Sequence, residues 1–212
     1  MPEERWYDAS VLLRPGTPEW PGDSPFDCRW TWRLAEGASV NLSTVSGSPH
    51  VGTHADAPLH VRDGAPASHD LPVEAFIGEA WVADVRHVTG EITLAALRLP
   101  DERRIPRLLL RTGRDITGGR FPDAWPSLSV DAIDALHARG LRLVGTDAPS
   151  VDDRESKDLR NHHRIFDGGA YVLENLDLRG VESGAWHLMA PPLRIEGLDA
   201  APVRALLKAP PR

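Results

Sequence analysis

The order of apolar and polar residues predicts a chain built more from strands than from helices. Apolar residues cluster or alternate in short runs that Gly, Pro, Asn or Asp interrupt, a pattern typical of β-strands. After the first run, the Pro/Gly-rich residues 14–25 are too punctuated for a regular element and predict a long surface loop. The predicted strands cover residues 5–13, 29–34, 39–45, 79–85, 107–113, 141–145, 170–176 and 184–190.

One segment carries a clear helical period. Residues 130–139 read V-D-A-I-D-A-L-H-A-R, with Ser129 as the N-cap and Gly140 as the terminator. A second pattern, at residues 93–99, predicts a short helix that ends before Pro100. The apolar side chains that share one face of the first helix are Val130, Ile133 and Leu136.

The connections between these elements indicate the fold class. The strand at 141–145 follows the helix directly, which is typical of α/β packing. A polar loop is expected between this strand and the one at 170–176. Because strands outnumber helices and do not alternate regularly with them, we expect an α/β fold with a mixed β core or barrel and a few packed helices. No repeat or linker divides residues 1–212, so we expect a single domain.

Composition narrows the classes of function. The chain has 212 residues, of which 41% are apolar and 26% charged, as in ordinary globular domains. A net charge of −7 and the lack of a dense basic run argue against nucleic-acid binding. No apolar run approaches the ~20 residues of a membrane span, and no apolar segment follows the charged amino terminus, so we expect a cytoplasmic protein. Cys28 is the only cysteine, so a bound metal would take nitrogen and oxygen ligands.

Residues 48–60, S-P-H-V-G-T-H-A-D-A-P-L-H, concentrate the candidate chemistry next to a predicted strand end. The spacing of His50 and His54 occurs on helices of zinc proteases, but the prolines and Gly52 argue against a helix here. On a straight strand the two residues would lie roughly 13 Å apart, so the chain must bend, at Gly52, for both to reach one metal. Asp56 would then lie on the same side as His54 and add an oxygen ligand.

Two histidines and one carboxylate leave a coordination position for water or substrate, which is typical of catalytic rather than structural sites. His60 follows closely enough to carry protons without being a ligand, because imidazole titrates near neutral pH. Taken singly, each histidine would more often be an ordinary surface residue, and the glycine and prolines could mark only a turn. The joint pattern H-x-x-x-H-x-D-x-x-x-H favours metal binding over these simpler interpretations.

The segment 48–60 resembles the signature of the bacterial cyclase family of metal-dependent hydrolases. The resemblance covers nearly the full length, and the downstream segments favour the formamidase branch of that family. The other matching segments are W-P-G-D at 20–23, L-L-L-R-T-G at 108–113, G-T-D-A-P-S-V-D at 145–152, S-K-D-L at 156–159 and A-P-V-R-A at 201–205.

This resemblance implies a swivelling β/β/α-type fold, a homodimer, and a pair of zinc ions in each subunit. It makes His60 the proton donor and acceptor and places Trp20 against the substrate. Because nitrogen and oxygen ligands also suit Mn²⁺ and Co²⁺, the identity of the metal stays open. The implied ligands are His50, His54 and Asp56 for the first ion, and Asp56, His162 and Glu174 for the second.

Without the resemblance, the later positions are weaker candidates. His162 and His163 are neighbours, so in an extended segment at most one would face the site, and the resemblance selects His162. Glu174 lies in an apolar strand, where a carboxylate needs a cation or hydrogen bonds. Trp20 could also be a surface-packing residue. Supporting roles or simple turn formation remain open for Asp147, Ser150 and Asp152, and Lys157 is assigned no catalytic role.

The activity that the resemblance implies is hydrolysis of N-formyl-L-kynurenine to L-kynurenine and formate. The chain has no G-x-S-x-G segment, which argues against a serine-hydrolase mechanism. Two alternatives stay open: hydrolysis of a cyclic amide such as isatin, or of another aryl amide, by the same ligands with manganese; and a metal-binding module without catalysis. A free proton carrier such as His60 has no use in the second.

Overall fold

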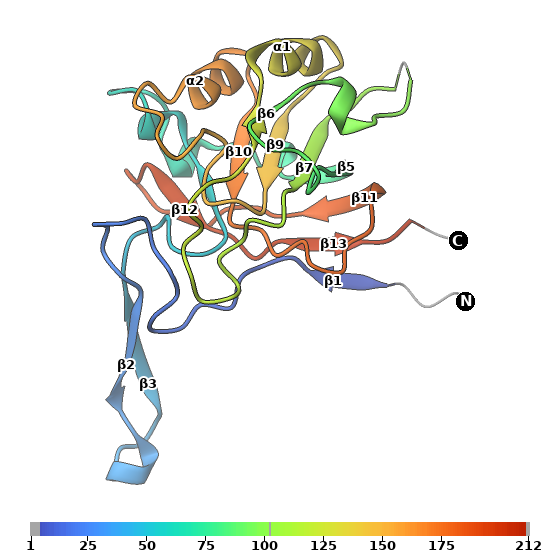
Figure 1. The fold of residues 1–212 in the computed structure, drawn as a ribbon. Helices are drawn as coiled ribbons and strands as arrows, with labels where there is room; N and C mark the ends of the chain where they lie inside the picture. The colour runs from blue at the N-terminus through green and yellow to red at the C-terminus, as the bar shows by residue number, and fades with distance from the viewer. Residues whose placement is uncertain (1–4, 102, 211–212) are drawn as a thin grey trace.

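The computed structural model describes residues 5–101 and 103–210, and a mixed nine-stranded sheet forms its centre (Figure 1). The strands lie in the order β1-β13-β11-β5-β7-β9-β10-β4-β12, so the sheet is open, with β1 and β12 at its edges. Their bounds are β1 Trp6–Asp8, β4 His54–Asp56, β5 Ile77–Asp84, β7 Arg107–Arg111, β9 Leu143–Thr146, β10 Tyr171–Glu174, β11 Gly184–Met189, β12 Ala200–Pro202 and β13 Leu206–Lys208.

The four central strands, β5, β7, β9 and β10, run parallel, and antiparallel strands flank them on both sides. Both faces of the parallel strands are covered, which explains the unbroken apolar run in β7. Leu108 and Leu110 pack into one buried cluster, while Leu109 between them packs into a second cluster on the other face. The mixed sheet with packed helices confirms the predicted α/β class, and each predicted strand overlaps an observed one.

Two α-helices, α1 (Val130–Ala138) and α2 (Arg160–Asp167), lie together over the parallel strands (Figure 1). The predicted helix corresponds to α1, and the Ser129 hydroxyl accepts from Ala132 N at 3.2 Å, as expected of an N-cap. Ile133 of α1 and Ile165 of α2 are fully buried against the sheet. Neither helix, nor any other in the described residues, is long and apolar enough to cross a membrane.

Two predictions of local structure were wrong. The pattern at 93–99 forms only a short 3₁₀ helix, η5 (Ala95–Leu97), because Arg98 turns into the left-handed region. The expected polar loop before β10 contains α2, whose sequence R-N-H-H-R-I-F-D lacks an apolar stripe. This helix is stabilised instead by the distant Asp152, whose carboxylate accepts from the amides of Asn161 and His162.

A hairpin of β2 (Asp27–Trp32) and β3 (Leu42–Ser46) extends away from the sheet (Figure 1). All residues of both strands are exposed, and η1 (Leu34–Glu36) lies near the hairpin tip. A second two-stranded sheet pairs β6 (Glu91–Ile92) with β8 (Ser127–Leu128). The remaining 3₁₀ helices are η2 Pro58–His60, η3 Ser68–Asp70 and η4 Val73–Ala75.

Candidate metal centre

Strand pairing brings three candidate ligands, His54, Asp56 and Glu174, onto one face of the sheet. β4 lies between β10 and β12, and its residues His54 and Asp56 point to the same side because they are two apart. Antiparallel pairing places Glu174 of β10 directly opposite His54. All three side chains are buried, with relative exposures of 1% for His54, 0% for Asp56 and 4% for Glu174.

The chain bends at Gly52, as expected, and this returns His50 to the side of His54. Gly52 has a φ of 73°, in the left-handed region that suits glycine. The nitrogens His50 Nδ1 and His54 Nε2 lie 3.2 Å apart. A side chain at position 52 would also collide with Leu13, since an added Cβ would be 2.4 Å from Leu13 Cδ2.

Helix α2 delivers His162 from the opposite direction. Its Nε2 lies 3.1 Å from Asp56 Oδ2 and 3.4 Å from Glu174 Oε1. The premise that His162 and His163 lie in an extended segment was wrong, but neighbouring residues also point apart on a helix. Accordingly, His162 is 1% exposed and faces the other candidates, whereas His163 is only partly buried.

Each of the three candidate ligand histidines donates a hydrogen bond from the ring nitrogen that points away from Asp56. The acceptors are a carbonyl or carboxylates, so these outer nitrogens carry the protons, and in the neutral ring the inner nitrogens are bare. This is the usual arrangement of histidines that bind metals. The bonds are His54 Nδ1 to the Gly52 carbonyl at 2.8 Å, His162 Nδ1 to Asp152 at 2.6 Å, and His50 Nε2 to Asp199 at 2.9 Å.

The inner ring nitrogens and Asp56 form a set that fits a divalent cation. His50 Nδ1, His54 Nε2 and Asp56 Oδ1 are each 3.2 Å from the other two. Ligands at 2.0–2.1 Å around a tetrahedral zinc ion would be roughly 3.3 Å apart. Asp56 Oδ1 is also buried without a hydrogen-bond partner among the described residues, an arrangement that a cation would satisfy.

The charges of this site also favour a bound divalent cation. Burial alone would lower the pKa of His50, but its hydrogen bond with Asp199 and its contact with the Asp56 carboxylate raise that pKa to about 10. Burial is likewise outweighed at His162, whose pKa is raised well above its usual value by Asp152, Asp56 and Glu174. The carboxylates therefore hold more negative charge than neutral rings can balance. A divalent cation would supply that balance and displace the protons.

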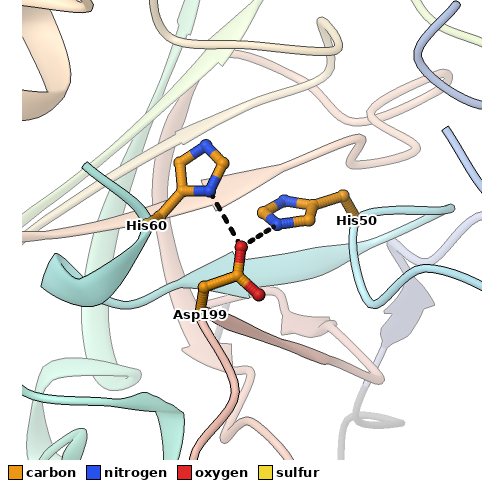
Figure 2. Close-up of side chains that lie close together, drawn as sticks. All are labelled: His50, His60 and Asp199. Carbon is orange, nitrogen blue, oxygen red and sulfur yellow. Dashed lines mark hydrogen bonds and ion pairs between the residues drawn. The ribbon is translucent and has the colours of Figure 1, made fainter. Parts of the chain in front are cut away.

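His60 stands beside this set at the end of η2. Its ring centroid lies 4.4 Å from that of His50 and 5.6 Å from that of His162. His60 Nδ1 lies 3.1 Å from Asp199 Oδ2, the same oxygen that accepts from His50 (Figure 2). The sequence interpretation missed Asp199. It lies in no recognisable motif and is 139 positions from His60, so only the pairing of β12 with β4 brings it here.

A cavity of about 660 Å³ opens over these residues. Trp20, 41% exposed, forms part of its wall and makes edge-to-face contacts with Phe121 and Trp125, at centroid distances of 5.5 and 6.0 Å. His50, His54, His60, His162, Glu174 and Asp199 also line the cavity. The predicted site residues are thus brought together, and all of them line the cavity except Asp56, which contacts the histidines from beneath its surface with 0% exposure.

The four remaining candidates have different surroundings. Asp152 orients His162 and the start of α2, as described above. Ser150 lines the cavity, and its hydroxyl accepts from Asp152 N at 3.1 Å. Asp147 instead accepts from the backbone amides of Thr112 and Gly113 and joins β9 to the end of β7. Lys157 is exposed.

The family of the chain follows from its sequence. Residues 7–153 match the Cyclase family model, whose description is "Putative cyclase", and the chain belongs to this family. Individual relatives in this comparison have names that specify an activity. The chain is 42% identical over 208 residues to the kynurenine formamidase of Salinibacter ruber (strain DSM 13855 / M31), which covers 96% of this chain and 97% of that protein.

Solved structures share the fold. A predicted metal-dependent hydrolase from Bacillus stearothermophilus matches with a TM-score of 0.81 and 26% identity, covering 97% of this chain and 98% of that one. Isatin hydrolase A from Labrenzia aggregata, bound to benzyl benzoate, matches with a TM-score of 0.81 over 97% of this chain and 94% of that one. At 23% identity, this second match speaks only to the fold.

Proposed function

We propose that this protein hydrolyses N-formyl-L-kynurenine to L-kynurenine and formate, a step of tryptophan degradation. The observation that carries the proposal is the convergence of three imidazole rings on the buried Asp56, at the base of a cavity large enough for a small aromatic substrate. The identity of 42% to a kynurenine formamidase over nearly the whole chain supports this choice of substrate.

The residues assigned to metal binding would hold two divalent ions, and Asp56 would belong to both sets of ligands. We take the ions to be zinc, although Mn²⁺ and Co²⁺ suit the same nitrogen and oxygen atoms. A bound metal pair supplies Lewis-acid polarisation of the formyl oxygen and acidification of water. The first ion would be held by His50, His54 and Asp56, and the second by Asp56, His162 and Glu174.

His60 would transfer protons in this reaction. Hydrolysis forms a carbon–oxygen bond to the formyl carbon and breaks its bond to the aryl nitrogen, so the departing amine needs a proton. His60 lines the cavity and can supply that proton from Nε2, because Nδ1 is engaged on the far side of the ring. A protonated aryl amine leaves more readily than an alkyl amine, so no covalent nucleophile is required.

Trp20 would pack against the aromatic ring of the substrate. Its own edge-to-face contacts with Phe121 and Trp125 hold the indole at the cavity wall. Aromatic pairs in such arrangements contribute about 0.5–1.5 kcal/mol beyond their buried area. An aryl substrate would therefore be preferred over an aliphatic formamide.

The decisive experiment removes the metal and compares two substrates. Chelation followed by dialysis is expected to abolish hydrolysis of N-formyl-L-kynurenine, and added Zn²⁺ to restore it. Elemental analysis must first show that the protein is metal-free. Unchanged turnover by that protein would contradict the mechanism. Side-by-side assays with isatin test the alternative, and faster opening of isatin would replace the proposed substrate.

Three wider properties complete the proposal. Residues 1–212 act as one hydrolase domain, which is supported by the single nine-stranded sheet whose strands come from Trp6 to Lys208. The protein works in the cytoplasm, where an exposed thiol such as Cys28 persists in reduced form. It forms a homodimer through the β2–β3 hairpin, since an isolated hairpin is only marginally stable in water and exposed tryptophans are suited to an interface.

A further inference from the structure

We propose that Asp199 is a positioning residue that fixes the tautomer of His60 and the orientation of His50 through one carboxylate oxygen (Figure 2). The part that concerns His60 rests on the proposed function, in which His60 carries protons. The part that concerns His50 requires only that this histidine binds a metal.

The backbone holds Asp199 firmly in place. The Asp199 carbonyl accepts from Ala57 N at 2.8 Å, and the carbonyl of the preceding Leu198 accepts from Ser68 N at 2.8 Å. The next residue, Ala200, begins β12 and pairs with Asp56. Asp199 is therefore fixed relative to the strand that carries two of the candidate ligands, and its side chain needs only its own rotamer to reach the histidines.

The Asp199 carboxylate accepts from His60 Nδ1 at 3.1 Å, so the neutral ring of His60 must carry its proton there and its lone pair at Nε2. A free imidazole would populate both tautomers. The tautomer with its proton on Nε2 lacks the lone pair that a proton carrier needs there. Asp199 thus selects the form that can accept a proton from water and later give it to the leaving amine. A buried Asp serves a histidine in the same way in the Ser-His-Asp triad.

The same Oδ2 atom accepts from His50 Nε2 at 2.9 Å and turns Nδ1 of that ring toward His54 and Asp56. Carboxylates that orient metal-binding histidines in this manner are worth about 10–100-fold in metal affinity. One residue therefore links a metal ligand to the proton carrier. Removing it should impair two measurable properties, through two different histidines.

Direct coordination is the competing role. His50, His60 and Asp199 offer atoms within 4.8 Å of one another, close enough to surround an ion. Asp199, however, meets His50 at Nε2, on the opposite side of the ring from Asp56. Its side chain is also 42% exposed, whereas that of Asp56 is 0% exposed. The geometry thus favours orientation of the rings over a separate ion at Asp199.

The test compares Asp199→Asn and Asp199→Ala with a matched control, Asp23→Asn. Asp23 lines the same cavity but accepts from Ser24 N instead of a histidine, so this variant removes the same charge without touching a ring. Three quantities are measured on zinc-loaded protein: kcat and KM separately, zinc affinity by competition with a chromophoric chelator, and the tautomer of His60 by ¹⁵N NMR of the histidine rings.

For both Asp199 variants we expect kcat to fall by about 10²–10³-fold, within the 10²–10⁴ that acid–base catalysis contributes, while KM changes little. Zinc affinity should fall by about 10–100-fold, and the Nδ1–H signal of His60 should weaken. In a His60→Ala background, Asp199→Asn should lower kcat by less than about threefold, because residues that act through one another are not additive. Asp23→Asn should keep the wild-type zinc affinity and His60 tautomer.

Two results would overturn the assignment. One is Asp199→Asn with wild-type zinc affinity and an unchanged His60 tautomer. The other is loss of one whole zinc ion per chain while the His60 tautomer is kept, which would make Asp199 a ligand. If wild-type protein fails to hydrolyse N-formyl-L-kynurenine but the zinc and NMR results hold, the proposed substrate fails and the role of Asp199 stands.

Discussion

At the scale of single residues, the candidate site is dominated by carboxylates that outnumber the cations available to them. Hydrogen bonds from His50 and His60 hold the pKa of Asp199 well below its usual range. The pKa of Asp56 is also lowered, because contacts with His54, His162 and His50 outweigh the cost of its burial. In the absence of metal, protons on the histidine rings must balance this charge.

This balance predicts how pH affects the metal-free protein. The folded-state pKa of His50, about 10, exceeds its usual value of 6.5. Its contribution to stability is therefore complete below pH 6.5 and is lost as pH rises through 10. Urea unfolding of metal-free protein should show a free energy of unfolding that falls over this range, by up to about 1.4 kcal/mol per pH unit for each such group.

The zinc-loaded protein should show the opposite sign, because protons compete with the metal for the same rings and acid weakens binding. His50→Ala is the control and should make the fall of the metal-free curve shallower, with the contribution of His162 remaining. Asp147, whose pKa burial raises to about 6, acts with the same sign but in a lower window, between pH 3.8 and 6. A free energy of unfolding that rises between pH 6.5 and 10 in metal-free protein would contradict this account.

At the scale of elements, one bend and one short strand place the candidate ligands of the segment from His50 to Asp56. We expect Gly52→Ala to destabilise the protein by about 1–3 kcal/mol, the usual cost of forcing a non-glycine residue into the left-handed region. The Leu13 side chain must also rotate away from the new methyl group. Zinc affinity should fall as well, because His50 and His54 are held at their 3.2 Å spacing by this bend.

Gly64→Ala provides the matched control for that prediction. Gly64 has a φ of 70°, close to the 73° of Gly52, but an added Cβ would meet no atom within 4 Å. It should carry the backbone cost and keep the zinc affinity of the wild type. Equal zinc affinities for the two variants, measured by chelator competition, would show that the bend at Gly52 does not set the site.

The elements also show where sequence reasoning succeeds and where it fails. The placement of His54 and Asp56 on one face follows from the period of two in a strand, and the bend follows from glycine, so both are visible in a few adjacent residues. Helix α2 was missed because its stabilising contacts come from Asp152, nine positions before Asn161. Asp199 was missed for the same kind of reason. Its partners His50 and His60 are far away in the sequence and come close only through the pairing of β12 with β4.

At the scale of the whole molecule, the β2–β3 hairpin is the feature least explained by a single chain. Trp30, Trp32 and Val45 are 54%, 55% and 67% exposed, on an arm that leaves the body of the protein (Figure 1). Apolar side chains gathered in this way are typical of surfaces that bind another protein. A second copy of the chain is the partner that we propose for them.

Light scattering coupled to gel filtration tests this proposal. Wild-type protein should have twice the mass of the 23.2 kDa chain. Val45→Asp should shift the mass toward a single chain, because a charge buried in an apolar interface is costly. Thr44→Asp adds the same charge to the neighbouring position, whose side chain points to the other face of the strand, and should have a smaller effect. A wild-type mass of one chain would refute the dimer.

The order of strands in the sheet has a consequence for synthesis. β4 emerges early from the ribosome, but both of its neighbours, β10 and β12, are made in the last quarter of the chain. A nascent polypeptide therefore carries its first histidines for most of translation without the strands that aim them. Glu174 of β10 and Asp199, which directly precedes β12, can therefore join His54 and Asp56 only once the last quarter of the chain has been made, so the complete site cannot assemble before the end of synthesis.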